Sequence, residues 1–263
     1  MRLKDIKGER LMDIEKMARY WSEDADNYGK IIEDELSSFR VSAWQELLKK
    51  QMPKNACEVL DFGCGPGFFS IILADMGYKV TAIDCSEGML SRARKNAESA
   101  GLSDKITFKV MDVSDMDFSD DSFDAVLSRN VTWTLSDPRK VYADVYRVLR
   151  PLGRVLLFDA NWQLCLYDEA LDRENNCRHE ECIRIYGADF ESDTPISEPF
   201  DARELPLSGV KRPYWDVEAL RMTGFRNAHA VKDLTATLWD EKEKLLYGET
   251  PLFGVFGDKS LGK

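Results

Sequence analysis

The chain has 263 residues, 44% of them hydrophobic, which suits one sizeable α/β domain with an added cap or insertion. Its net charge of −11 argues against a nucleic-acid partner, because phosphate binding needs a basic face. No run approaches the roughly 18 apolar residues of a membrane span, and the charged N-terminus lacks a signal-peptide core. Six scattered cysteines predict a reduced, cytoplasmic protein, which we expect to be a monomer or a homodimer.

Residues 1–50 predict a helical N-terminal cap, because apolar side chains recur there at a loose helical period. The stretch from Tyr20 to Gly29 is polar but carries three aromatic residues, Tyr20, Trp21 and Tyr28. These rings either simply pack against the core or form a lid over a bound ligand. We expect that they form a lid.

Residues 58–73 combine a strand, a turn and a helix. The apolar run of residues 58–62 is typical of a strand buried on both faces. Gly63, Gly65 and Gly67 follow at once, and residues 68–73 then begin an amphipathic helix. Because glycine lets a ligand approach the main chain closely, this order predicts a nucleotide-type cofactor site.

The glycine spacing indicates which cofactor. The pattern is G-x-G-x-G, and Phe68 stands where a dinucleotide-binding motif has a small residue. The Asp61 carboxylate would repel a diphosphate but could hold an ammonium group. This block resembles motif I of the class I S-adenosylmethionine (SAM)-dependent methyltransferases, h-h-D-h-G-x-G-x-G. The resemblance implies that SAM lies against Asp61, Gly63, Cys64, Gly65 and Gly67.

The second strand is predicted at residues 79–84. Asp84 ends it, and a carboxylate at this tip can accept hydrogen bonds from both ribose hydroxyls. Asp84 could instead cap the helix expected from Glu87 to Ala100, but Ser86 can serve there. Met89, one turn into that helix, either contacts the adenine or belongs to the core.

The third and fourth predicted strands also resemble the methyltransferase family. Residues 106–110 form the third strand, and Asp112 falls where the family accepts a hydrogen bond from the adenine amino group. The resemblance also places Cys85 and Val113 beside the cofactor. Residues 118–128 form a turn and the fourth strand, and there Asp124 marks motif II.

The end of the fourth strand should border the transferred methyl group, because ligands of open α/β sheets bind outside the carboxyl ends of the strands. Arg129, Asn130 and Trp133 lie there, and Arg129 is also a candidate for cofactor contact. A helix starts at Asp137-Pro138, and R-V-L-R-P-L-G-R leads into a fifth strand at residues 155–160. The family usually has Gly at Leu152.

The remaining chain is less regular. A helix is expected from Gln163 to Ala188, and another at residues 216–224. The sixth and seventh strands are expected at 225–231 and 252–256, with a helix at 238–247 between them. We therefore predict a Rossmann-like α/β fold with a seven-stranded, mostly parallel sheet, one antiparallel strand and helices on both faces. Residues 1–50 are the cap, and residues 51–263 are the catalytic domain with a substrate-side insertion at 161–212.

Cysteine and histidine gather in the insertion, at Cys165, Cys177, His179 and Cys182. Such a set could hold a soft metal, but the spacing is not a standard zinc motif, and positions five apart do not share a helix face. We expect no metal site. An acceptor such as arsenite, bound by these thiols, is a less favoured version of the function.

The function that we predict is methyl transfer from SAM to a small-molecule acceptor, leaving S-adenosylhomocysteine (SAH). Alignment alone can supply much of the rate, and no catalytic dyad is found. Tyr20, Tyr28, Arg129, Asn130 and Trp133 are the acceptor-side candidates. A non-catalytic SAM-binding module is the alternative. A nicotinamide-dependent oxidoreductase is disfavoured by Phe68 and by the lack of a Tyr-x-x-x-Lys pair.

Overall fold

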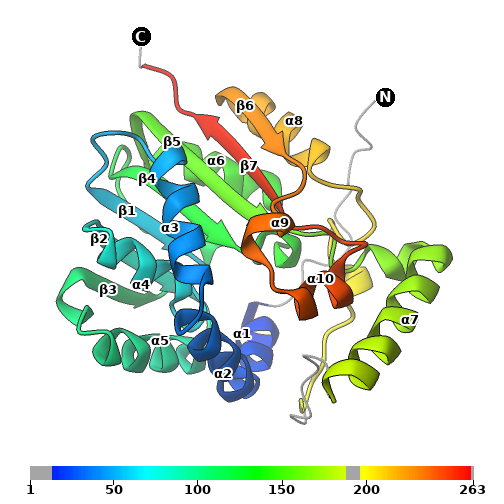
Figure 1. Cartoon of the computed structure of the whole chain (residues 1–263). Helices are drawn as coiled ribbons and strands as arrows, with labels where there is room; N and C mark the ends of the chain where they lie inside the picture. Colours follow the sequence, from blue (N-terminus) through cyan, green and yellow to red (C-terminus); the bar gives the residue numbers. More distant parts are fainter. Residues whose placement is uncertain (1–13, 188–195, 262–263) are drawn as a thin grey trace.

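The computed structural model describes residues 14–187 and 196–261, which contain a seven-stranded sheet (Figure 1). The strand order is β3-β2-β1-β4-β5-β7-β6. The strands are β1 (Glu58–Phe62), β2 (Lys79–Asp84), β3 (Ile106–Val110), β4 (Phe123–Arg129), β5 (Leu149–Asp159), β6 (Arg226–Val231) and β7 (Phe253–Asp258). Strands β1 to β5 pair in parallel, and β7 is antiparallel to both β5 and β6. The predicted fold class is confirmed.

Helices cover both faces of this sheet (Figure 1). They are α1 (Ile14–Glu23), α2 (Ala25–Leu36), α3 (Arg40–Gln51), α4 (Phe68–Asp75), α5 (Glu87–Ser99), α6 (Pro138–Val148), α7 (Glu169–Tyr186), α8 (Tyr214–Thr223), α9 (Thr235–Leu238) and α10 (Glu241–Tyr247). Because side chains alternate along a strand, Val59 of β1 packs into the core beneath α3 and α4, and Leu60 into the core beneath α6 and α8. None of the helices described here is long and apolar enough to cross a membrane.

Helices α1 and α2 dock on α5, at the edge of the sheet where β2 and β3 lie (Figure 1). The Ser22 and Ser86 hydroxyls are 2.8 Å apart. At Gly88 an added Cβ would lie 2.9 Å from the Ser22 Cα, so glycine permits the close approach of the two helices. Arg92 on α5 adds an ion pair of 3.0 Å to Asp26 on α2.

Three elements differ from their predicted bounds by more than about two residues. Strand β5 begins at Leu149 rather than at residue 155, because Leu149 already pairs with Phe123 of β4. The helix predicted at 238–247 is divided, since Trp239 is extended and Asp240 starts α10 with a capping box closed by Glu243. The helix expected from residue 163 is a 3-10 turn, η4 (Leu164–Tyr167), followed by α7; its expected end, Ala188, lies outside the described residues.

Candidate active site

A cavity, here called the strand-tip cavity, lies at the carboxyl ends of β1, β2 and β4. The strand order reverses between β1 and β4, and open α/β sheets bind ligands at such a point. The structure brings nearly all of the predicted cofactor residues to its wall. These are Asp61, Gly63, Cys64, Gly65, Asp84, Cys85, Met89, Asp112, Val113 and Arg129.

The three glycines of the turn do not all have the role that was expected of them. Gly63 has φ +61°, and a Cβ there would lie 2.5 Å from Val131, so the turn leaves no room for a side chain. Gly67 has φ +92° and caps α4, where its Cα faces Ala93 of α5. Gly67 is not among the residues that line the cavity. Its role is therefore to turn the chain into the helix.

Asp84 holds the turn from the tip of β2. Its Oδ2 accepts a hydrogen bond from the Gly65 N–H at 2.9 Å, and its Oδ1 accepts one from the Ser86 N–H at 2.9 Å. Burial raises the pKa of this carboxyl. Each oxygen keeps a further lone pair, so Asp84 can still accept from a ligand in the cavity.

Asp61, at the end of β1, is a second buried carboxyl in this wall. It accepts a hydrogen bond of 2.6 Å from the Ser70 hydroxyl on α4. Its pKa is raised to about 7, chiefly by burial and also by the nearby Asp84 charge, while the hydrogen bond from Ser70 opposes the rise. A cationic ligand group beside Asp61 would favour the charged form.

The other predicted cofactor residues complete the wall. Asp112 accepts from the Ser114 N–H and hydroxyl at 2.8 and 2.6 Å, so its side chain also caps the short 3-10 turn η2 (Val113–Asp115). Met89 is 2% exposed and reaches the cavity from α5, so it serves both the core and the site. Burial raises the pKa of the Cys85 thiol to about 12, which makes it a poor nucleophile.

A second cavity, here called the aromatic cavity, adjoins the first. It is lined by aromatic rings from four parts of the chain. They are Tyr20, Trp21, Tyr28, Trp44, Trp133, Trp162, Trp239 and Tyr247. Asp24, Glu35, Arg40, Arg129 and Glu243 are its charged residues among those described.

Four residues line both cavities: Trp21, Tyr28, Arg129 and Asn130. Asn130 has φ +59° at the end of β4, and its buried Oδ1 has no hydrogen-bond partner among the described residues. Burial raises the pKa of the Tyr28 hydroxyl. A group that passes from one cavity to the other meets these four side chains.

Arg129 is buried at this junction. Its guanidinium donates two hydrogen bonds to Glu35 of α2, the shorter of 2.6 Å, and lies 4.1 Å from the centroid of the Phe68 ring. The side chain is therefore held on one side by a carboxylate and on the other by an aromatic face.

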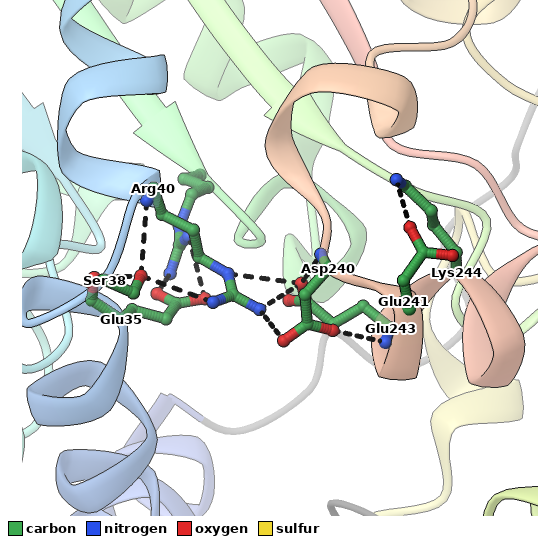
Figure 2. A network of polar contacts seen from close by, with 8 residues as sticks. Glu35, Ser38, Arg40, Asp240, Glu241, Glu243 and Lys244 are labelled. Carbon is green, nitrogen blue, oxygen red and sulfur yellow. Dashed lines mark hydrogen bonds and ion pairs between the residues drawn. The ribbon is translucent and has the colours of Figure 1, made fainter.

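The other arginine of the aromatic cavity, Arg40 of α3, is also paired. Figure 2 shows its guanidinium between Ser38 on one side and Asp240 and Glu243 on the other. It bonds Asp240 at 2.8 Å and is ion-paired with Glu243. This network ties α3 to the start of α10, more than half the chain away.

A buried network supports Trp133, beneath the aromatic cavity. Asp159 at the end of β5 accepts from the Trp133 N–H at 3.0 Å and from the Trp162 indole at 2.9 Å. Arg212 pairs with Asp159 at 3.0 Å and with Asp216 at 2.8 Å. Burial opposes a charge on Arg212, but the two carboxylates raise its pKa. The network fixes two of the lining rings.

Several lining residues were not predicted from the sequence. The aromatic cavity uses Trp239, Glu243 and Tyr247 as a wall, and from the described part of 161–212 only Trp162 and Gln163 line it. Phe200 of that segment packs behind Tyr20 and Trp133. Helix α7 contacts α10 instead. Trp162 could have been identified as a lining residue from its position in the sequence, directly beyond the end of the fifth strand.

The cysteine and histidine side chains of the insertion do not come together in one site. Cys177 is exposed and Cys182 is buried on α7, and Cys165 lies on η4. Within residues 14–187 and 196–261, no group of three or more His, Cys, Asp or Glu side chains is placed to hold a metal ion.

Residues 60–157 match the family model described as "Methyltransferase domain". The putative methyltransferase YqeM of Bacillus subtilis is 34% identical over 138 residues, covering 51% of this chain and 54% of the relative. Demethylmenaquinone methyltransferase of Clavibacter sepedonicus is 40% identical over 99 residues, covering 38% and 39%. The chain thus spans about half or less of the length of these relatives.

The fold is shared with solved structures. Phosphoethanolamine N-methyltransferase 2 of Haemonchus contortus, in complex with phosphomonomethylethanolamine and S-adenosylhomocysteine, superposes with a TM-score of 0.65 at 18% identity. The match covers 97% of this chain and 61% of that one. This likeness concerns the fold.

Proposed function

We propose that this protein, in which residues 60–157 match a methyltransferase-domain model, is a SAM-dependent methyltransferase that binds SAM in the strand-tip cavity and methylates a small molecule held in the aromatic cavity. The observation that carries the proposal is the junction: Trp21, Tyr28, Arg129 and Asn130 line both cavities. Two ligands that meet there would have their reacting groups side by side.

The residues that line the strand-tip cavity support the binding of SAM through their chemistry. The cradle formed by Gly63 and Gly65 leaves main chain, not side chain, against the ligand. Asp84 would accept from the ribose hydroxyls, Asp61 would face the ammonium group, and Asp112 and Met89 would border the adenine. When bound, SAM supplies an activated methyl group, whose carbon–sulfur bonding electrons stay on sulfur as the acceptor bonds the carbon.

The chain itself would contribute orientation and exclusion of water. Helix α1 lies over the strand-tip cavity with Met17 and Trp21 in its wall, which supports the lid role of the N-terminal cap. A closed, dry site strengthens electrostatic interactions and aligns the reactants. No protein nucleophile is needed for this reaction.

Titration calorimetry tests the cofactor. SAM and SAH should bind in the micromolar range, and NAD should not bind. Asp84→Ala removes hydrogen bonds to a charged acceptor, so the affinity for SAM should fall about 10–100-fold. Asp104→Ala, an exposed carboxylate outside the cavity, is the control and should bind normally. Unchanged SAM affinity in Asp84→Ala would overturn the proposed cofactor site.

Turnover separates an enzyme from a non-catalytic SAM-binding module. Formation of SAH with a panel of small acceptors should be detectable, and Trp133→Ala should impair it while SAM affinity stays within a few-fold. A protein that binds SAM but forms no SAH with any acceptor class would favour the binding module.

A further inference from the structure

We infer that the methyl acceptor is an uncharged, flat heteroaromatic molecule that is methylated on a ring nitrogen with a free lone pair. This inference rests on the proposed function, since it names the substrate class of the same site. Three features support it: the charged side chains of the aromatic cavity are already bonded within the protein, its walls are aromatic rings, and transfer to such a nitrogen releases no proton.

The two arginines of the aromatic cavity are each paired with carboxylates of the protein. Arg129 bonds both oxygens of Glu35, at 3.3 and 2.6 Å. Figure 2 shows Arg40 held by Asp240 and Glu243, and Glu243 Oε2 also accepts from the Asp240 N–H at 2.9 Å. An anionic acceptor would have to displace a carboxylate from one of these arginines.

Asp24, the fifth charged residue of the described lining, is also engaged. It is 8% exposed, directly precedes α2, and accepts a hydrogen bond of 3.3 Å from the Asn27 amide. All five charged side chains are thus committed to contacts within the protein. A charged acceptor of either sign would give up its hydration and would compete with bonds that already exist. An uncharged acceptor avoids this cost.

Aromatic rings form the walls that such an acceptor would meet. Trp162, Trp239 and Tyr247 form a cluster with ring centroids 5.3 to 6.4 Å apart. Tyr20 and Tyr28 line the same cavity from α1 and α2, where each has its ring near that of Trp21. Aromatic rings pack favourably against one another in offset or edge-to-face arrangements, so a flat aromatic molecule suits these walls.

Methyl transfer to a ring nitrogen is balanced without any proton movement. The bonding electrons between the methyl carbon and sulfur stay on sulfur, and the nitrogen lone pair forms the new bond to carbon. The positive charge moves from sulfur to the acceptor, and the faces of the surrounding rings stabilise this cation. A hydroxyl or ammonium acceptor would also have to pass a proton to a base, whereas the carboxylates of this cavity already accept hydrogen bonds from the protein.

Four bicyclic molecules of nearly equal shape test the charge. At mildly alkaline pH, isoquinoline and 2-naphthol are uncharged, 2-naphthoate is an anion and 2-naphthylmethylamine is a cation. Their affinities are measured by calorimetry on the full chain saturated with SAH. The two uncharged molecules should bind about tenfold or more tighter than either charged one.

Product analysis tests the atom that is methylated. With SAM present, mass spectrometry should detect the N-methyl product of isoquinoline or of quinoline, whose nitrogen occupies the neighbouring ring position. The methyl ether of 2-naphthol should form at least about tenfold more slowly. Failure to methylate either heterocycle would overturn the ring-nitrogen acceptor.

A pair of variants on α10 tests the role of the paired charges. Glu243→Gln keeps the shape of the side chain but removes one carboxylate from Arg40. The ratio of 2-naphthoate affinity to isoquinoline affinity should therefore rise about tenfold. Glu241→Gln changes an exposed carboxylate of the same helix, and this control should leave the ratio as it is in the wild type.

A second pair of variants tests the aromatic wall. Trp239→Leu should weaken isoquinoline binding about 2–10-fold, because it replaces a ring by an aliphatic side chain. Trp239→Phe keeps a ring and should weaken the binding less. SAH binding shows that each variant is folded.

The outcomes separate the two proposals. If SAH does not bind to the wild type, the proposed function fails. If SAH binds but a charged probe binds as tightly as isoquinoline, or 2-naphthol is methylated as fast, the inference about the acceptor is wrong and the proposed function stands. The inference is equally wrong if folded Glu243→Gln keeps the wild-type affinity ratio, or if Trp239→Leu and Trp239→Phe bind isoquinoline as tightly as wild type.

Discussion

Arg129 at the end of β4 forms a 2.6 Å ion pair with Glu35 of α2, although the two residues are 94 positions apart in the chain. Their side chains are only 11% and 13% exposed. The pair fastens the N-terminal helices to the point where the two cavities meet. It also neutralises a cation that lines both cavities.

Glu35→Gln should destabilise the protein, because it leaves the buried Arg129 guanidinium without its carboxylate partner. Breaking such a pair costs about 3–5 kcal/mol when fully buried, and we expect about 3 kcal/mol here. Urea denaturation measures the loss. The double variant Glu35→Gln/Arg129→Gln should recover part of it, since no charge is then left buried. A single variant as stable as wild type would mean that solvent compensates for the lost pair.

Gly88→Ala should loosen the N-terminal helices without weakening the core. An added Cβ at Gly88 meets the Ser22 backbone at 2.9 Å, so α1 has to move away from α5. Alanine in a helix is favoured over glycine by about 1 kcal/mol, which offsets any loss within α5. We expect SAM to dissociate several-fold faster in stopped-flow measurements. Wild-type dissociation kinetics would indicate that α1 does not cover the cofactor.

SAM affinity should depend on pH through Asp61. Burial raises the pKa of Asp61 to about 7, so much of the unliganded protein carries a proton there at mildly acidic pH. A ligand ammonium group would displace this proton. Affinity should therefore rise between about pH 5.5 and about pH 7, by at most tenfold per pH unit, and Asp61→Asn should flatten the profile. Equal pH profiles of wild type and Asp61→Asn would place the ammonium group elsewhere.

The same group should influence the stability of the unliganded protein. The pKa of Asp61 is higher in the folded state than in the unfolded chain, so the folded state binds the extra proton. This contribution to stability is complete below about pH 4 and is lost as the pH rises through about 7. The difference in free energy of unfolding between wild type and Asp61→Asn should follow that trend in urea titrations at several pH values.

Leu152→Gly should stabilise the protein. Leu152 has φ +65° and is 61% exposed, so its side chain gains little from packing while its backbone is strained. The left-handed conformation costs a non-glycine residue about 1–2 kcal/mol, which exceeds the entropic cost of glycine. We expect a gain of about 1 kcal/mol in urea denaturation. Leu152→Ala, which keeps the Cβ, is the control and should show no gain.

Arg212→Met should be among the most destabilising substitutions in the chain. It leaves Asp159 and Asp216, both fully buried, without their shared cation. The expected cost is about 3–5 kcal/mol. Arg94→Met breaks an exposed pair with Glu87 and should cost about 0–1 kcal/mol. Similar melting temperatures for the two variants would contradict the importance of the buried network.

Local patterns in the sequence were enough to predict the sheet and most of the residues that line the strand-tip cavity. Apolar runs mark β1 to β4, and Asp61, Asp84 and Asp112 each stand at or just beyond the end of such a run. Because the carboxyl ends of parallel strands meet at one edge of a sheet, local patterns were enough to bring these residues together. The same logic placed Asn130 at the end of the fourth strand. It did not reveal that Gly67 lies against α5 and does not line the strand-tip cavity.

The charge and the walls of the aromatic cavity depend on contacts between distant parts of the chain, which local patterns do not predict. Arg40 is neutralised by Glu243, which lies 203 positions further along the chain, and Glu35 neutralises Arg129. Trp239 and Tyr247 join the wall because the predicted helix 238–247 is interrupted and α10 turns toward α3. Local periodicity reports which face of an element is buried, but it does not report which distant elements share a cavity. The charge that an acceptor meets depends on those distant pairings.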